Sequence, residues 1–142
     1  MEALLSDWRW LVSGKFEPVL MNVFRDAFMA DSAGRLHFLD LMSGGFKVVA
    51  KSREEFDLLC EDGEHRLSWF IPHLAMELRK VHGDLAPGKC FSCKIPLALG
   101  GQLEVGNFEP ADIQVHYSIL GQLYQQIQHM PAGTRIRDIH IE

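Results

Sequence analysis

The sequence predicts an α+β domain in which an antiparallel β-meander sheet carries helices packed mainly on one face. Four short β-rich runs lie between residues 19 and 50, separated by turns of two to five residues. Apolar residues recur at helical spacing from residue 52 onward. A chain of 142 residues is also close to the size of one typical domain. We therefore expect a single domain over residues 1–142.

Composition and charge narrow the class of partner. Hydrophobic residues make up 47% of the chain and charged residues 23%, values that argue for a folded protein. The formal net charge of −5 argues against a general attraction to nucleic acid phosphate or anionic lipid. No apolar run approaches the 18 residues that a membrane span requires. We expect no direct nucleic acid or membrane contact, and a basic partner would suit the charge.

The cysteines and the first residues bear on the compartment. Cys60, Cys90 and Cys93 are an odd number, which does not suggest a disulfide framework. The first eight residues, M-E-A-L-L-S-D-W, lack the basic start and the apolar core of a secretory signal. We therefore expect a reducing, cytoplasmic location.

The first half of the chain reads as a helix followed by the meander. Apolar residues three and four apart over residues 3–12 predict a short amphipathic helix, ended by Gly14, on the edge of the sheet. The predicted strands are Val19–Phe24, Ala27–Ala30, Leu36–Leu41 and Phe46–Ala50. The first and last of these strands are apolar at both alternating sets of positions, and so on both faces, which suggests that helices cover much of the sheet.

Ser52 begins the predicted helical part. Its hydroxyl lies three residues before Glu55, the spacing of a capping box, so a helix should start there. The buried stripe of this helix is expected to comprise Phe56, Leu58, Leu59 and Cys60. Glu61-Asp62-Gly63 should end it.

A second helical pattern covers residues 64–82 but contains Pro72. Proline lacks an amide hydrogen and clashes with the preceding turn, so the helix is either kinked near Ser68 or begins at Ile71 with Pro72 in its first turn. We favour the second interpretation, with residues 64–70 as a separate short turn.

The last third is less regular. Residues 85–101 contain several prolines and glycines and predict irregular or short extended segments, and the loop over residues 90–107 is expected to brace the far side of the sheet. Asp112–His116 alternates and predicts a strand, followed by a helix through Ile119–Ile127. Ile136, Ile139 and Ile141 suggest a final edge strand or tail.

The candidate chemistry is sparse. Cys90-x-x-Cys93 has the spacing of half a zinc site, but no second half occurs, and only His82, His116 and scattered histidines could complete it. Histidines show no fixed spacing with Ser or Cys nucleophiles, and Gly-x-Ser-x-Gly is missing. We therefore predict a protein that is not an enzyme, with no catalytic residue, no metal and no cofactor.

One charged stretch and two tryptophans are candidates for partner binding. Six acids lie within eleven residues, partly offset by Arg53; such a run is usually a solvated face, and the functional alternative is a patch for a basic partner. Tryptophan occurs in cores and as an interface anchor. The candidates are Glu54, Glu55, Asp57, Glu61, Asp62, Glu64, Trp8 and Trp10. The glutamine-rich last helix is an alternative face.

Several motifs together resemble one bacterial family. They are K-C-F-S-C-K-I-P-L-A-L-G-G, N-F-E-P-A-D-I-Q-V-H-Y-S-I-L-G-Q-L-Y-Q-Q-I and P-A-G-T. The chain is similar there to the C-terminal domain of type VI secretion DNase immunity proteins. The upstream motifs F-E-P-V-L-M-N-V-F-R-D-A-F, G-R-L-H-F-L-D and S-R-E-E-F extend the likeness to residues 16–134.

The resemblance implies a cytoplasmic immunity (antitoxin) protein. Such a protein binds a cognate secreted effector, with a nuclease as one expected target, and blocks the effector's active site. The family has no established catalytic residues. The alternatives are a small-molecule or metal-binding domain that uses Cys90, Cys93 and His116, or a homo-oligomeric scaffold. A monomer and a homodimer both remain open.

Overall fold

The computed structural model describes residues 1–131 and Ile141. The strands are β1 (Glu17–Met21), β2 (Ala27–Ala30), β3 (Leu36–Asp40), β4 (Gly45–Ala50), β5 (Lys89–Cys93) and β6 (Phe108–Asp112). The α-helices are α1 (Arg53–Glu61), α2 (Gly63–Phe70), α3 (Pro72–His82) and α4 (Ile113–Ile127). Short 3₁₀ helices are η1 (Leu4–Trp8), η2 (Leu97–Leu99) and η3 (Val105–Asn107). No helix in this part of the chain is both long and apolar enough to cross a membrane.

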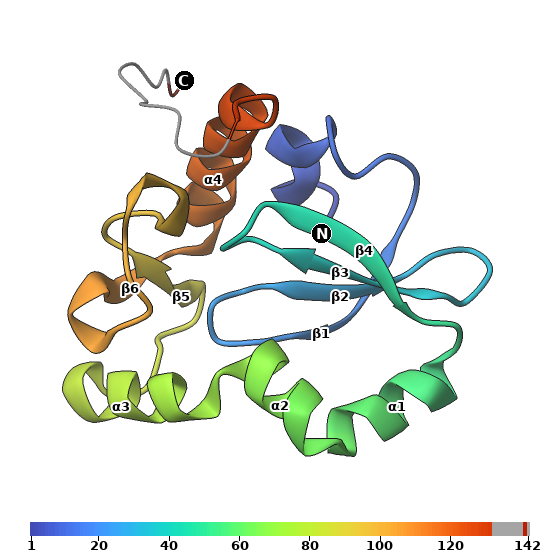
Figure 1. Ribbon diagram of the computed structural model, residues 1–142, viewed down its shortest axis with the longest axis horizontal. Helices are drawn as coiled ribbons and strands as arrows, with labels where there is room; N and C mark the ends of the chain where they lie inside the picture. Colours follow the sequence, from blue (N-terminus) through green and yellow to red (C-terminus); the bar gives the residue numbers. More distant parts are fainter. Residues whose placement is uncertain (132–140, 142) are drawn as a thin grey trace.

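The first four strands form the predicted antiparallel meander. They pair in the order β1-β2-β3-β4, and each neighbouring pair is antiparallel (Figure 1). In the centre of the sheet Phe28 lies opposite Phe38, and their rings stack with centroids 4.4 Å apart. The α+β class with its meander is confirmed.

Helices cover both faces of this sheet rather than mainly one. β2 explains why, because its alternating side chains are buried on both faces. Phe28 contacts α1 and α2 through the rings of Phe56 and Trp69, each with its centroid 4.9 Å away. On the other face, Met29 shares a core cluster with Trp8 of η1 and with buried residues of α4.

β5 and β6 form a separate two-stranded antiparallel sheet that the sequence interpretation did not include. It lies beside α3 in Figure 1, and Leu74 and Leu78 of that helix share a cluster with Phe91 and Phe108. The backbone amide of Phe91 also donates to the carbonyl of Val23 at 2.9 Å, which ties this sheet to the turn after β1. Part of the predicted irregular loop over residues 90–107 is therefore a strand that packs against α3.

Two predicted elements near the start differ in the structure. The prediction of an amphipathic helix over residues 3–12 is wrong, because only η1 is helical. A turn follows η1, in which the amide of Val12 donates to the carbonyl of Trp8. β1 ends at Met21 and not at Phe24. Asn22 causes this, since its side-chain carbonyl accepts hydrogen bonds from the amides of Phe24 and Asp26 and so closes a turn.

The favoured interpretation of the middle helices is confirmed. Pro72 is the first residue of α3, and Ile71 before it adopts a left-handed conformation with φ 41°. The stretch before it is a full helix, α2, and not a short turn. Ile71 thus ends one helix and begins the next.

The predicted strand over residues 112–116 is wrong. Only Asp112 belongs to a strand, as the last residue of β6, and α4 begins at the next residue. The carboxylate of Asp112 accepts hydrogen bonds from the amides of Gln114 and Val115, so it caps α4. His116 lies inside that helix. The suggested final strand falls at Ile136 and Ile139, outside the described residues, while Ile141 is 40% exposed.

Candidate protein-binding surface

Of the six acids of the predicted run, four lie on α1 and one on α2, and Asp62 lies between these two consecutive helices, along one side of the molecule (Figure 1). Glu55 is half-buried, and the other five are exposed. We call this set the acidic surface. Its members are Glu54, Glu55, Asp57, Glu61, Asp62 and Glu64.

Hydrogen bonds at the start of each helix hold the backbone of the acidic surface. The amide of Glu55 donates to the Ser52 hydroxyl at 3.2 Å, which confirms the predicted cap of α1. Asp62 caps α2 in the same way, accepting from the amide of His65 at 3.2 Å. The His65 ring nitrogen Nδ1 lies 2.6 Å from the same carboxylate, and this hydrogen bond lowers the pKa of Asp62. The first turns of both helices are thereby fixed, and the Asp62 carboxylate is oriented.

Most of the formal charge of the protein gathers here. Six acids against Arg53 and Arg66 leave −4 over residues 52–70, out of −5 for the whole chain. Arg53 and Asp57 form a salt bridge at 3.0 Å, but both side chains are 61% exposed, so solvent weakens it. Within the described part of the chain, Glu54, Glu61 and Glu64 form no salt bridge. The surface therefore presents unneutralised carboxylates.

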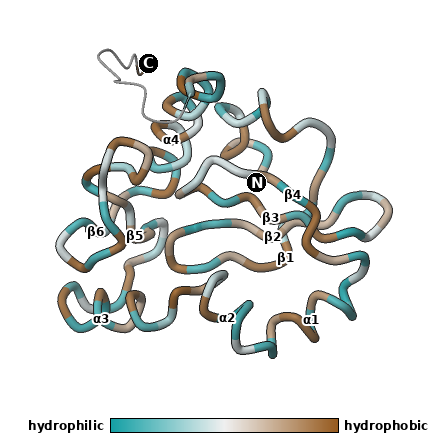
Figure 2. Tube along the Cα trace, viewed as in Figure 1, coloured by the Kyte–Doolittle hydropathy of each residue, from teal (hydrophilic) through white to brown (hydrophobic). Residues whose placement is uncertain are grey.

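Two leucines interrupt the acidic surface, and the sequence interpretation placed Leu58 in the buried stripe of its helix. Leu58 of α1 is 69% exposed and Leu67 of α2 is 64% exposed. Leu58 was expected in the buried stripe with Phe56, but two residues along a helix turn the side chain by about 200° and place it on the opposite side. Figure 2 shows hydrophobic residues alternating with hydrophilic ones along both helices. The sequence itself carried a signal against the predicted stripe, because Phe56 and Leu58 are two residues apart and cannot both lie on the buried side of one helix.

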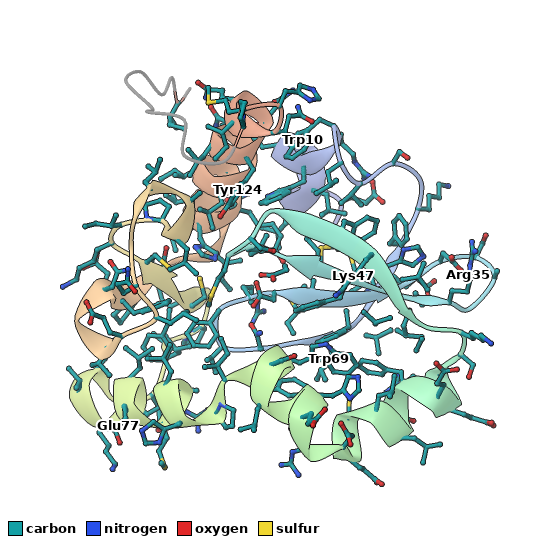
Figure 3. The ribbon with its side chains drawn as sticks, in the orientation of Figure 1. Trp10, Arg35, Lys47, Trp69, Glu77 and Tyr124 are labelled. Atoms are coloured by element: carbon teal, nitrogen blue, oxygen red, sulfur yellow. The ribbon has the colours of Figure 1, made fainter. Side chains whose placement is uncertain are left out.

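The structure does not bring Trp8 and Trp10 to the acidic surface. Trp8 is fully buried, and its indole nitrogen donates to the carbonyl of Tyr117 at 2.9 Å. Trp10 is half-buried, and its indole nitrogen donates to the carbonyls of Asp7 and Gly121. In Figure 3 it lies beside α4, at the opposite end of the molecule from Trp69. Both indoles serve the packing of η1 on α4.

The alternative metal site lacks a suitable arrangement. Cys90 and Cys93 lie three residues apart on β5, so their side chains point to opposite faces of the strand. Burial raises the pKa of Cys90 to about 12 and that of Cys93 to about 11, which keeps both thiols protonated. Among the residues that the structure describes, no group of three His, Cys, Asp or Glu side chains could hold a metal ion.

His116, the third residue of that alternative, is fixed by two hydrogen bonds. Its Nε2 lies 3.0 Å from the carbonyl of Phe24 and must donate there, since a carbonyl only accepts. Nδ1 is then the acceptor for the Ser92 hydroxyl at 2.8 Å. Burial lowers the pKa of His116 to about 4, so the ring is neutral and a poor base for activating Ser92. This pair connects α4, β5 and the turn after β1.

Comparisons with known proteins bear on the function. A family model described as T6SS immunity protein Tdi1, C-terminal, matches residues 50–124. The match runs from the end of β4 into α4 and so includes α1 and α2 with the whole acidic surface. It confirms the resemblance seen in the sequence motifs. A search of the curated proteins gives no match.

Proposed function

Because this chain belongs to the family of the C-terminal domain of the T6SS immunity protein Tdi1, we propose that it is an immunity protein that binds and neutralises a cognate secreted effector. We further propose that the target is a nuclease, that the two proteins meet in the cytoplasm, and that inhibition occurs by covering the effector's active site. The inhibition is non-catalytic. The observation that supports this proposal is the acidic surface on α1 and α2.

The charge of this surface suits a nucleic-acid-binding cleft. A nuclease must attract phosphate, so its active-site cleft carries a positive potential. A surface with a formal charge of −4 over residues 52–70 complements such a cleft and repels nucleic acid itself. The protein would occupy the cleft as a competitor of the substrate.

This mode of inhibition requires a preformed surface and no reactive group. The side-chain caps of α1 and α2 fix their first turns, and Phe56 and Trp69 anchor the two helices on the sheet. A surface ordered before binding loses little conformational entropy in the complex, which favours affinity.

Co-expression with the cognate effector tests the proposal. Wild type should protect the cells. A variant with Glu54, Glu55, Asp57 and Glu61 changed to lysine should fold, because three of these acids are exposed and Glu55 is half-buried, and such helix charges contribute only tenths of a kcal/mol each. This variant should fail to protect. A control with lysine at four other exposed acids, Glu17, Asp84, Glu104 and Glu109, changes the net charge equally and should still protect.

The outcomes separate two claims. If wild type gives no protection, the immunity function fails for this effector. If wild type and the charge-reversed variant protect equally well, the effector is bound by another surface and the assignment to α1 and α2 fails.

A further inference from the structure

Leu58 and Leu67 project from the acidic surface, and their positions explain why they are exposed. Phe56 is two residues before Leu58, and Trp69 is two residues after Leu67. In each helix a separation of two residues places the side chains on opposite sides. Phe56 and Trp69 are buried at 1% and 6% exposure, while the two leucines are 69% and 64% exposed.

The two leucines face the same side of the molecule. Phe56 and Trp69 both pack on Phe28 of the sheet, and their own rings stack with centroids 5.8 Å apart. Since both aromatics point into one core cluster, the side chains opposite them point away from it together. Leu58 and Leu67 are the most exposed of the large hydrophobic side chains in the described part of the chain.

We propose that Leu58 and Leu67 are the apolar anchors of this surface and that they insert into an apolar recess of the effector, which lysine and arginine side chains frame. This inference rests on the proposed immunity function. Tight interfaces combine a few desolvated anchors with a polar rim. Here Glu54, Asp57, Glu61 and Glu64 would form the rim, and charge complementarity selects a basic partner over other occupants.

The same charges argue against a second copy of the chain as the occupant. Two copies joined through this surface would bring two sets of acids together, each with a formal charge of −4 over residues 52–70. Like charges facing each other across an interface cost several kcal/mol. The leucines therefore remain open to a partner of opposite charge.

A binding measurement with purified wild type, effector and two double variants tests this inference. Leu58→Ser with Leu67→Ser should raise the dissociation constant by about 30-fold or more, mainly through faster dissociation. The salt dependence of binding should stay as in wild type, because no charge has changed. Val81→Ser with Met76→Ser on α3, whose side chains are 63% and 50% exposed, is the matched control and should bind as wild type does.

The possible failures are distinguishable. If wild type does not bind the effector, the immunity function fails and this inference with it. If wild type and the leucine variant bind equally well, the function stands and the anchors are refuted. Size-exclusion chromatography of the free proteins supplies the third outcome: a wild-type dimer that the leucine variant loses would assign the leucines to self-association and overturn the inference.

Discussion

The side-chain amide of Asn22 donates to the carboxylate of Asp26 at 2.8 Å inside the turn between β1 and β2. Both residues are buried, at 7% and 3% exposure. The same amide nitrogen donates to the carbonyl of Trp69 at 2.8 Å, and the other Asp26 oxygen accepts from the amide of Leu41 at 2.8 Å. This turn thus joins the sheet to the end of α2, the helix that carries Glu64 and is capped by Asp62 of the acidic surface.

The raised pKa of the buried Asp26 carboxyl predicts an unusual pH dependence of the free energy of unfolding. Burial raises its pKa from 3.8 to about 7, so between these values the folded chain keeps a proton that the unfolded chain has lost. The contribution of Asp26 to stability is therefore largest below pH 4 and falls as pH rises toward 7, by up to about 1.4 kcal/mol per unit.

His116 acts in the opposite direction. Its pKa falls from 6.5 to about 4, so its contribution is complete above pH 6.5 and is lost as pH falls toward 4. The two effects offset each other over this window.

Asp26→Asn should therefore show an unfolding free energy that rises with pH relative to wild type, and His116→Gln should show the reverse. Urea denaturation from pH 4 to 7 measures both; curves parallel to wild type would refute the two shifts.

Ser52→Ala tests the start of α1. Loss of the hydrogen bond from the Glu55 amide should lower the free energy of unfolding by about 1 kcal/mol. Ser68→Ala, at an exposed position within α2, is the control and should change it by no more than about 0.5 kcal/mol. Equal effects of the two substitutions would mean that the cap has no special role.

Gly121→Ala tests the packing of η1 on α4. A methyl group at Gly121 would lie 2.6 Å from the carbonyl oxygen of Asp7, a backbone atom that cannot rotate away. We expect a loss of about 1–3 kcal/mol in thermal or denaturant unfolding. Gly63→Ala in the first turn of α2 meets nothing within 4 Å and should be neutral or stabilising. A neutral Gly121→Ala would contradict the close contact.

Metal analysis tests the alternative function. The opposed side chains of Cys90 and Cys93 lead us to expect zinc well below one equivalent after mild purification. Stoichiometric zinc that is lost in Cys93→Ser would overturn the binding-only function.

The parts of the fold that could be predicted have local causes. Ala27–Ala30 was predicted with the bounds of β2, because turn residues flank it on both sides. The cap at Ser52 and the start of α3 at Pro72 depend on nearest neighbours in the chain. Such signals need no knowledge of tertiary contacts.

The errors arise where distant contacts decide. β5 pairs with β6 across 14 intervening residues, and Pro110 within β6 hides the strand signal. Residues 113–116 looked like a strand because the capping residue Asp112, followed by alternating apolar and polar residues, mimics strand alternation. For the candidate site, sequence located the acids, but the burial of Trp8 and the exposure of Leu58 and Leu67 depend on which helix face meets the sheet.

The central claim is that the chain neutralises an effector through the acidic surface, and the dissociation constant for the purified effector tests it most directly. Wild type and the variant with lysine at Glu54, Glu55, Asp57 and Glu61 should be compared at about 0.05 and 0.5 M salt. We predict tight wild-type binding that weakens with salt, and variant binding at least about 100-fold weaker at low salt. Equal dissociation constants for the two proteins at both salt concentrations would contradict the claim.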